Sequence, residues 1–160
     1  MKNPSMAHPE PAARFAGVRA ATLALCAPLS AEDMALQSMP DASPAKWHLA
    51  NTTWFFETFV LAASSDRYRR FHPRFEQLFN SYYRAVGEPF SRPRRGLLSR
   101  PSLDEVLAYR EHVDAAMVDL LSVARAKIPR ALLGIAELGL HHEQQHQELI
   151  LTDLKHALAQ

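Results

Sequence analysis

The chain has 160 residues, 48% of them hydrophobic, which is enough for one domain with a core of its own. Eighteen basic against seventeen acidic residues leave no large field of one sign, so we expect a small-molecule substrate, with no nucleic acid and no membrane as partner. The single cysteine, Cys26, excludes an internal disulfide and every thiolate zinc pattern, and it suits a reducing, cytoplasmic location. No run approaches the roughly 18 apolar residues of a membrane span.

The N-terminal part of the chain begins with ten polar, proline-broken residues. They predict a flexible tail over residues 1–10 and a folded domain over residues 11–160. A first helix is expected from about Pro11 to Pro28, where apolar side chains recur at steps of three and four. A second is expected from about Pro44 to Ala63. Ser43 is its predicted N-cap, and a proline in the first helical position costs no hydrogen bond there.

The middle of the chain, residues 71–99, is less regular. It has room for one or two helical turns, but the stretch EPFSRPRRGLLSRP contains too much proline for a long helix. A connection of this length in a compact domain is usually functional or disordered. Its aromatic and arginine content favours an ordered, functional crossover.

Two further helices follow. Ser102 and Glu105 have the spacing of a capping box, which predicts a third helix from this point. Pro129 is a start signal for a long fourth helix that ends near Ala159 and has no internal proline. Because no alternating strand pattern is present, the sequence predicts an all-α four-helix bundle with a long crossover between helices two and three. Bundles of this kind build their sites from side chains that project inward from facing helices.

The fourth helix contains the segment GLHHEQQHQELILTDLKH, which holds four of the eight histidines. His142 and His146 are four residues apart, so they share one helix face and can offer two imidazoles to one ion. His141 is expected at the surface or behind the ligands, and His156 at the surface. Four neighbours at the same spacing as the pair predict that this face turns toward the core: Ile135, Leu138, Leu149 and Asp153.

Three kinds of metal site are considered for this histidine-containing segment. HEQQH matches the zinc protease motif with Glu143 as general base, but those enzymes take a third ligand further downstream and only fourteen residues follow His146. A di-iron site would need a second Glu-x-x-His motif, and none occurs. In the third arrangement the pair takes its remaining ligand from another helix, and His48 is the candidate. Hydrogen-bonded core histidines are the alternative interpretation.

Three blocks together resemble the N-terminal DinB-like domain of EgtB-type ergothioneine sulfoxide synthases: SPAKWHLANTTWFFETFVL, LFNSYYRAVGEPFSRPRRGLLSRPSLDEVLAYREHVD and LGLHHEQQHQELILTDLKHAL. The resemblance implies a DinB-like bundle with a mononuclear iron(II) centre held by His48, His142 and His146, and zinc or nickel are the other ions considered. Members of the family join a cysteine-type thiol to the imidazole carbon of trimethylhistidine, using oxygen, and yield a sulfoxide. Three neutral imidazoles leave the ion its full charge and open positions, and a thiol bound there should lose its proton.

The resemblance also implies substrate contacts. Gln145 matches a residue near the imidazole substrate, and an amide can both donate to and accept from that ring. Arg92 and Arg95 match the segment that holds the carboxylate of the thiol substrate, a role that suits the planar guanidinium. An exposed glutamine and a solvated basic loop are the alternative interpretations. Glu148 and Asp153 are candidates for orienting a ligand imidazole.

Synthases of this type have a second, C-terminal domain of the sulfatase-activating fold, which supplies a catalytic tyrosine and is not among these 160 residues. The sequence is therefore expected to be either a fragment of a longer protein or a stand-alone domain that works with a separate partner. We therefore expect metal binding here and turnover only with a separate partner of that type, or a homodimer. No catalytic residue is assigned beyond the metal site, and Tyr82, Tyr83 and Trp54 are expected in the core. Two other functions stay open: a stand-alone metal-dependent thiol transferase and a non-catalytic metal-binding module.

Overall fold

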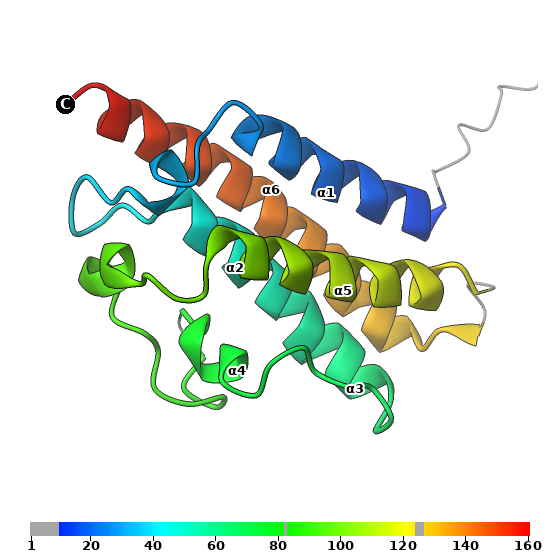
Figure 1. The fold of residues 1–160 in the computed structure, drawn as a ribbon. Coiled ribbons are helices and arrows are strands. Elements are labelled where there is room, and N and C mark those ends of the chain that lie inside the picture. The colour runs from blue at the N-terminus through cyan, green and yellow to red at the C-terminus, as the bar shows by residue number, and fades with distance from the viewer. Residues whose placement is uncertain (1–9, 82, 124–126) are drawn as a thin grey trace, which may run out of the picture.

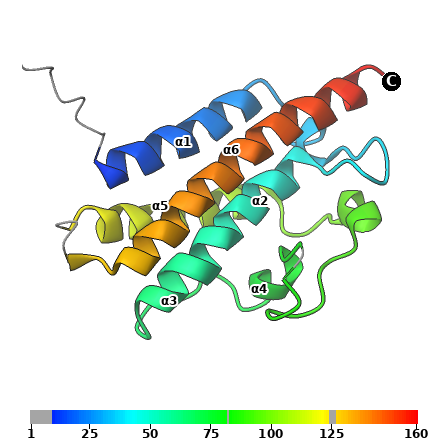
Figure 2. The same ribbon diagram turned by 180° about the vertical axis from the view of Figure 1, so that it is seen from behind.

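The computed structural model describes residues 10–81, 83–123 and 127–160, and every regular element within these ranges is helical. The predicted tail lies outside the described residues, apart from Glu10. Four long helices form a bundle in which α6 and α5 each pack against both α1 and α2 (Figures 1 and 2). The predicted all-α bundle is therefore confirmed. The long helices are α1 (Pro11–Cys26), α2 (Ala45–Phe56), α5 (Leu103–Leu121) and α6 (Arg130–Leu158).

Shorter helical segments connect and extend the bundle. The second long helix continues beyond α2 through a π-helical segment and a last α-turn, and it ends within one residue of the predicted position. The crossover contains one α-turn and one 3-10 segment, as its irregular sequence predicts. These elements are η1 (Asp33–Ala35), η2 (Glu57–Leu61), α3 (Ala62–Ser64), α4 (Phe75–Leu78) and η3 (Arg92–Leu97).

The start of α2 differs from the prediction. Pro44 is the N-cap, and Ser43 makes no side-chain cap because both of its polar groups have tertiary partners. Its backbone N–H donates to Asp153 Oδ2 at 2.8 Å, and its hydroxyl accepts from Arg95 Nη1 at 2.9 Å. The prediction of Ser43 as N-cap is wrong, since contacts with α6 and η3 outweigh the local capping preference.

The other predicted helix ends agree with the structure. The capping box of α5 is complete: Glu105 N donates to Ser102 Oγ at 3.2 Å, and Ser102 N donates to Glu105 Oε2 at 2.7 Å. The fourth long helix starts directly after Pro129 and ends one residue before Ala159. No helix in the described part of the chain is both long enough and apolar enough to cross a membrane.

The crossover covers the outer side of α2, which is buried along almost its whole length. Trp54 Nε1 donates to the Glu76 carbonyl at 2.7 Å, and Asn51 Nδ2 donates to the Phe79 carbonyl at 2.7 Å. Phe79 is itself 2% exposed. These contacts hold the described part of the crossover against α2, and they explain why α2 is apolar on more than one face.

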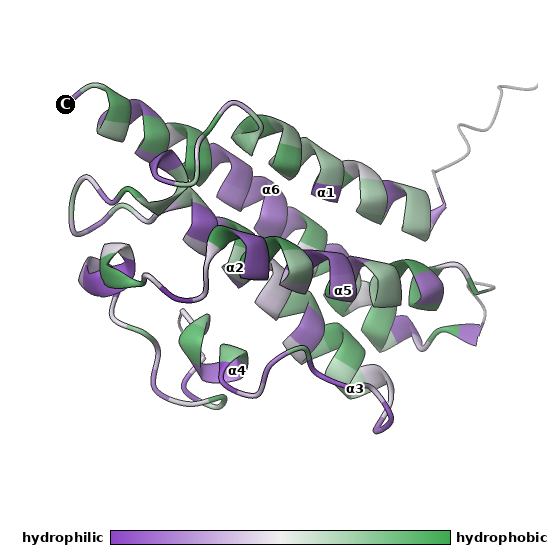
Figure 3. Ribbon diagram, in the orientation of Figure 1, coloured by the Kyte–Doolittle hydropathy of each residue, from purple (hydrophilic) through white to green (hydrophobic). Residues whose placement is uncertain are grey.

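A polar cluster that the sequence analysis missed lies inside the bundle. Arg19 of α1 donates to Asp114 at 2.6 Å and to Glu143 at 2.8 Å, and Arg110 of α5 donates to the other Glu143 oxygen at 2.5 Å. Buried charges are tolerated when they are paired and hydrogen-bonded, and these two pairs leave the cluster neutral. Figure 3 shows the hydrophilic residues along the middle of α6 from which Glu143 comes. The polar residues that complete the cluster are Thr22, Thr52, Thr53 and Gln147.

Candidate metal centre

One cavity of about 260 Å³ is lined by all six residues that the sequence analysis assigned to the site. They come from three elements that are distant in sequence and that the bundle brings together. The six are His48 from α2, Arg92 and Arg95 from η3, and His142, Gln145 and His146 from α6.

His146 contacts both of the other two histidines. The Nδ1 atoms of His48 and His146 are 2.8 Å apart, and their ring centroids are 5.0 Å apart. The rings of His142 and His146 have centroids 4.5 Å apart. Nδ1 of His142 is buried and has no hydrogen-bond partner among the described residues. A buried, unpaired ring nitrogen next to two other imidazoles is unusual for histidines that serve only in a core.

Burial keeps the three imidazoles neutral. It lowers the pKa of His48, although the hydrogen bond to Asp153 partly offsets this effect. Burial and the neighbouring His48 lower the pKa of His142 to about 4. Burial and the other two imidazoles hold the pKa of His146 well below its ordinary value. At neutral pH each ring therefore has one nitrogen lone pair that is not taken by a proton.

The donor set suits a metal ion, but its atoms are arranged for hydrogen bonding. Among the described residues, no three histidine, cysteine, aspartate or glutamate side chains are grouped as a metal site. Two nitrogens that bind one zinc-like ion at about 2.1 Å lie about 3.4 Å apart in a tetrahedral site, whereas the Nδ1 atoms of His48 and His146 are 2.8 Å apart. A cation would therefore have to replace this hydrogen bond. Three neutral imidazoles, one with an unpartnered buried nitrogen, fit that requirement.

Of the two carboxylates considered as supports, Asp153 contacts a predicted ligand. Its Oδ2 lies 3.1 Å from His48 Nε2 and accepts the Ser43 N–H at 2.8 Å. Glu148 is exposed on α6 and does not line the cavity. Only Asp153 is therefore placed to orient a ligand ring.

The helix face that carries His142 and His146 borders the cavity and solvent. Leu138 is 57% exposed and Leu149 is 37% exposed, whereas Ile135 packs against the core and Asp153 is partly buried, so the prediction that this face turns toward the core holds only in part. The core-facing side of α6 is the one with Glu143, because the buried arginines fix the rotation of the helix. His141 is exposed, as expected. His156 is partly buried, contrary to the prediction, and its Nδ1 lies 2.7 Å from Ser38 Oγ.

Glu143 cannot act as the general base of a zinc protease. It is fully buried, and its carboxylate is held by Arg19 and Arg110 on the side of α6 away from the cavity. Burial alone would raise the pKa of this carboxyl, but the two guanidinium groups outweigh burial and lower it to about 2. The structure therefore gives a second reason, besides the missing third ligand, why HEQQH is not a zinc protease motif in this sequence.

Arg95 forms part of the cavity wall. Only 5% of the residue is exposed, so the solvated-loop interpretation is wrong for it. Its guanidinium carbon lies 4.0 Å from the Trp47 ring centroid, and Nη1 and Nη2 donate to Ser43 Oγ at 2.9 Å and to Ser81 Oγ at 3.2 Å. Arg92 is more exposed and donates to the Asp41 carbonyl at 3.4 Å.

Aromatic and amide residues complete the walls. Trp54 is buried, as expected, but it also lines the cavity. Tyr83 lines the cavity and is 40% exposed, so its prediction as a core residue is wrong, and Tyr82 lies outside the described residues. Gln145 is exposed on α6 and lines the cavity. Asn51 is a wall residue to which the sequence analysis assigned no role, and it lies one helical turn after His48.

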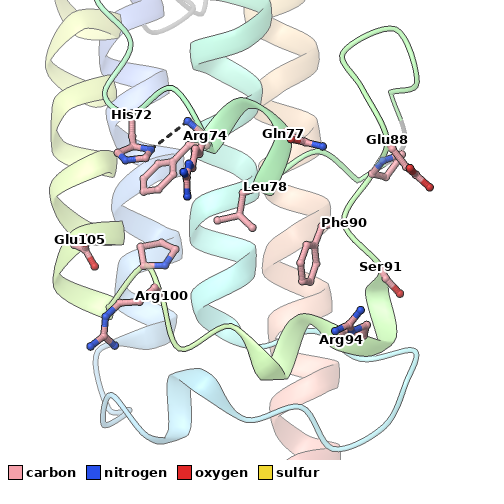
Figure 4. Close-up of a pocket in the computed structure, with 13 residues that line it drawn as sticks. His72, Arg74, Gln77, Leu78, Glu88, Phe90, Ser91, Arg94, Arg100 and Glu105 are labelled. Atoms are coloured by element: carbon pink, nitrogen blue, oxygen red, sulfur yellow. Dashed lines mark hydrogen bonds between the residues drawn. The ribbon is translucent and has the colours of Figure 1, made fainter.

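A larger hollow of about 760 Å³ lies between α4, the second half of the crossover and the start of α5 (Figure 4). Arg74, Leu78 and Phe90 surround it, and Arg94 lies at one edge. Its lining contains a single histidine, His72, and none of the six predicted site residues. We therefore place the candidate site in the smaller cavity.

The bundle and its cavity define a helical protein in which two helices offer three neutral imidazoles to one small site. The chain belongs to the DinB superfamily, whose family model matches residues 14–150. Comparison with curated proteins found no match. The predicted DinB-like fold is therefore confirmed at the level of the superfamily, and the synthase branch within it is the subject of the proposal that follows.

Proposed function

We propose that this chain is the three-histidine, iron(II)-binding domain of a sulfoxide synthase of the ergothioneine type. The observation that carries the proposal is the single cavity lined by all six predicted residues. His48, His142 and His146 would hold the ion, and their neutral state leaves it the full positive charge. The unpartnered Nδ1 of His142 supports this assignment, because a buried ring nitrogen needs a partner that the described residues do not supply.

The proposed reaction joins a cysteine-type thiol to trimethylhistidine. The thiol S–H bond and the imidazole C–H bond break, and a C–S bond forms. One atom of dioxygen ends on sulfur, and the other leaves as water with the two hydrogens. When bound, iron(II) would supply a Lewis acid for the thiol and a redox partner for dioxygen.

The chain's own residues would bind and orient the substrates. The arginines of η3 stand on one wall, and Arg95 presents its guanidinium in a fixed orientation because Trp47 and two serines hold it. A planar guanidinium suits the carboxylate of the thiol substrate. Gln145, which lines the cavity from α6, can donate to or accept from the imidazole substrate.

The size of the cavity supports the need for a partner. Small-molecule pockets usually have about 300 to 1,000 Å³, and this cavity of about 260 Å³ is to hold two substrates. Exposed apolar side chains stand beside it, among them Tyr83 and Leu149. Both features favour a second wall supplied by a separate domain, and the sulfatase-activating type is the expected one.

The first experiment measures iron(II) uptake without oxygen. The wild-type chain is expected to bind one ion, and His48→Ala, His142→Ala and His146→Ala are each expected to weaken binding at least tenfold. His141→Ala is the matched control, because this histidine lies on the same helix but is exposed. Uptake that survives His48→Ala would overturn the three-ligand site.

The second experiment measures turnover with trimethylhistidine, a cysteine-type thiol and oxygen, with a sulfatase-activating-type domain added as a separate polypeptide. Sulfoxide that forms only with iron and both polypeptides is the expected result. Zinc-dependent thiol transfer without oxygen would instead make the chain a thiol transferase. Metal uptake with neither product would leave a non-catalytic metal-binding module.

A further inference from the structure

Asp153 connects the C-terminal half of α6 with the start of α2. Its Oδ2 accepts the backbone N–H of Ser43 at 2.8 Å and lies 3.1 Å from His48 Nε2. The side chain of Asp153 is 14% exposed and that of His48 is 4% exposed. This contact is therefore largely shielded from water and fixes one edge of the imidazole.

The contact determines which nitrogen of His48 carries hydrogen. A carboxylate that is ionised at neutral pH only accepts hydrogen bonds, and the Ser43 amide only donates. His48 Nε2 must therefore be the N–H that donates to Asp153. The lone pair of the neutral ring is then on Nδ1, which faces His146 Nδ1 at 2.8 Å.

We infer that Asp153 is a positioning residue that holds His48 in the Nε2–H tautomer, so that Nδ1 is the atom His48 offers to a metal ion. The inference rests on the proposed metal site for its consequence, but the tautomer itself is a property of the metal-free protein. Without metal, His146 Nδ1 is the donor of the hydrogen bond to His48. An ion that binds His48 has to displace this bond.

The contacts of Asp153 also extend, through Ser43, to Arg95 in the wall of the cavity. Ser43 donates to Asp153 through its backbone and accepts from Arg95 through its hydroxyl, so one residue connects the support of His48 with the arginine proposed for the thiol substrate. Loss of Asp153 is therefore expected to disturb both the ligand ring and the start of α2. This connection distinguishes Asp153 from a surface carboxylate.

The tautomer is tested by ¹⁵N nuclear magnetic resonance of the metal-free chain with labelled histidine. We expect wild-type His48 to show a protonated Nε2 and an unprotonated Nδ1. Asp153→Ala is expected to shift His48 toward the Nδ1–H form, and Asp153→Asn, whose amide oxygen can still accept, should retain the wild-type form. Glu148→Ala is the control, because Glu148 is an exposed carboxylate on the same helix. A wild-type His48 with hydrogen on Nδ1 would overturn the inference.

Metal binding is tested separately by titration with cobalt(II), whose absorption bands report the ligand set. Loss of such a supporting carboxylate typically weakens metal binding 10- to 100-fold, so we expect about this change for Asp153→Ala and little change for Glu148→Ala. Equal affinity of Asp153→Ala and wild type would overturn the positioning role and leave the three-histidine site intact. A wild-type chain that binds no metal would overturn the proposed function, while the ¹⁵N spectrum would still decide the tautomer.

Discussion

Glu143 and Arg110 are joined across the bundle interior by an ion pair of 2.5 Å between Oε1 and Nη2. The glutamate is fully buried, and Arg19 binds its other oxygen at 2.8 Å. Because Glu143 directly follows His142, this pairing fixes the rotation of α6. It turns the carboxylate inward, and His142 and His146 toward the cavity.

Replacement of Glu143 is expected to destabilise the fold strongly. Glu143→Gln leaves two buried guanidinium groups without their shared counter-charge, and breaking a buried pair typically costs about 3 to 5 kcal/mol. The free energy of unfolding, measured in urea, checks this value. Glu137→Gln is the control, because the side chains of the Arg14–Glu137 pair are 38% and 44% exposed and solvent-accessible pairs contribute about 0 to 1 kcal/mol. Similar losses in both variants would contradict the role of the buried cluster.

Two glycines of α6 are expected to respond oppositely to alanine. A Cβ at Gly139 would lie 2.5 Å from a Phe56 ring carbon and 3.0 Å from one of Phe55, whereas a Cβ at Gly134 would meet nothing within 4 Å. Gly139→Ala should therefore lower the free energy of unfolding by about 1 to 3 kcal/mol. Gly134→Ala should raise it by about 0.5 to 1 kcal/mol, because alanine is the better helix former.

The Gly139 substitution should also reach the site. The Phe55 ring lies 5.0 Å from the His142 ring, centroid to centroid. Displacement of Phe55 is therefore expected to change the His142 signals in a histidine-selective spectrum, while Gly134→Ala leaves them unchanged. A spectrum in which neither variant moves these signals would show that the Phe55 contact does not position His142.

Alkaline pH is expected to weaken the fold through Tyr109. Its hydroxyl donates to the buried Glu57 carboxylate at 2.6 Å, and burial together with the Glu57 charge holds the pKa of this phenol well above 10. A pKa that is raised by folding gives stability that is present below the ordinary value of about 10 and is lost as pH rises above it.

Unfolding free energies measured from pH 8 to 11.5 test this expectation. The stability difference between wild type and Tyr109→Phe should be largest at neutral pH and should shrink above about pH 10. Tyr83→Phe controls for loss of a hydroxyl, since Tyr83 is 40% exposed. A difference that does not change with pH would contradict the assignment.

Substitutions of the two arginines of η3 are expected to differ in their effect on stability but not in their effect on substrate binding. Arg95→Ala removes the hydrogen bonds of a buried guanidinium to Ser43 and Ser81, each worth about 1.5 to 3 kcal/mol when the donor is charged, so a loss of at least this size is expected. Arg92→Ala should cost less, because Arg92 is more exposed. Both variants should weaken binding of the proposed thiol substrate in titrations of the metal-loaded chain. Unchanged binding in both would remove the arginines from the site.

Local sequence rules were sufficient for the helices and for part of the site. Capping residues and helix periodicity predicted the start of α5 and both ends of α6 to within about one residue. The four-residue spacing of His142 and His146 placed them on one face. His48 was a candidate for the third ligand from its place in the second predicted helix, and the resemblance of three separate blocks supported it, because spacing within one helix carries no information about a ligand from another.

The tertiary structure decided which way these faces turn. Periodicity showed that His142 shares a face with Leu138, but the buried arginines turn Glu143 inward and leave Leu138 57% exposed. The support of His48 by Asp153 joins residues 105 positions apart. The sequence alone thus determined the helices and the histidine pair, because both depend on short-range geometry. The rotation of α6, the partners of Ser43 and the tautomer of His48 depend on through-space contacts that exist only in the packed bundle.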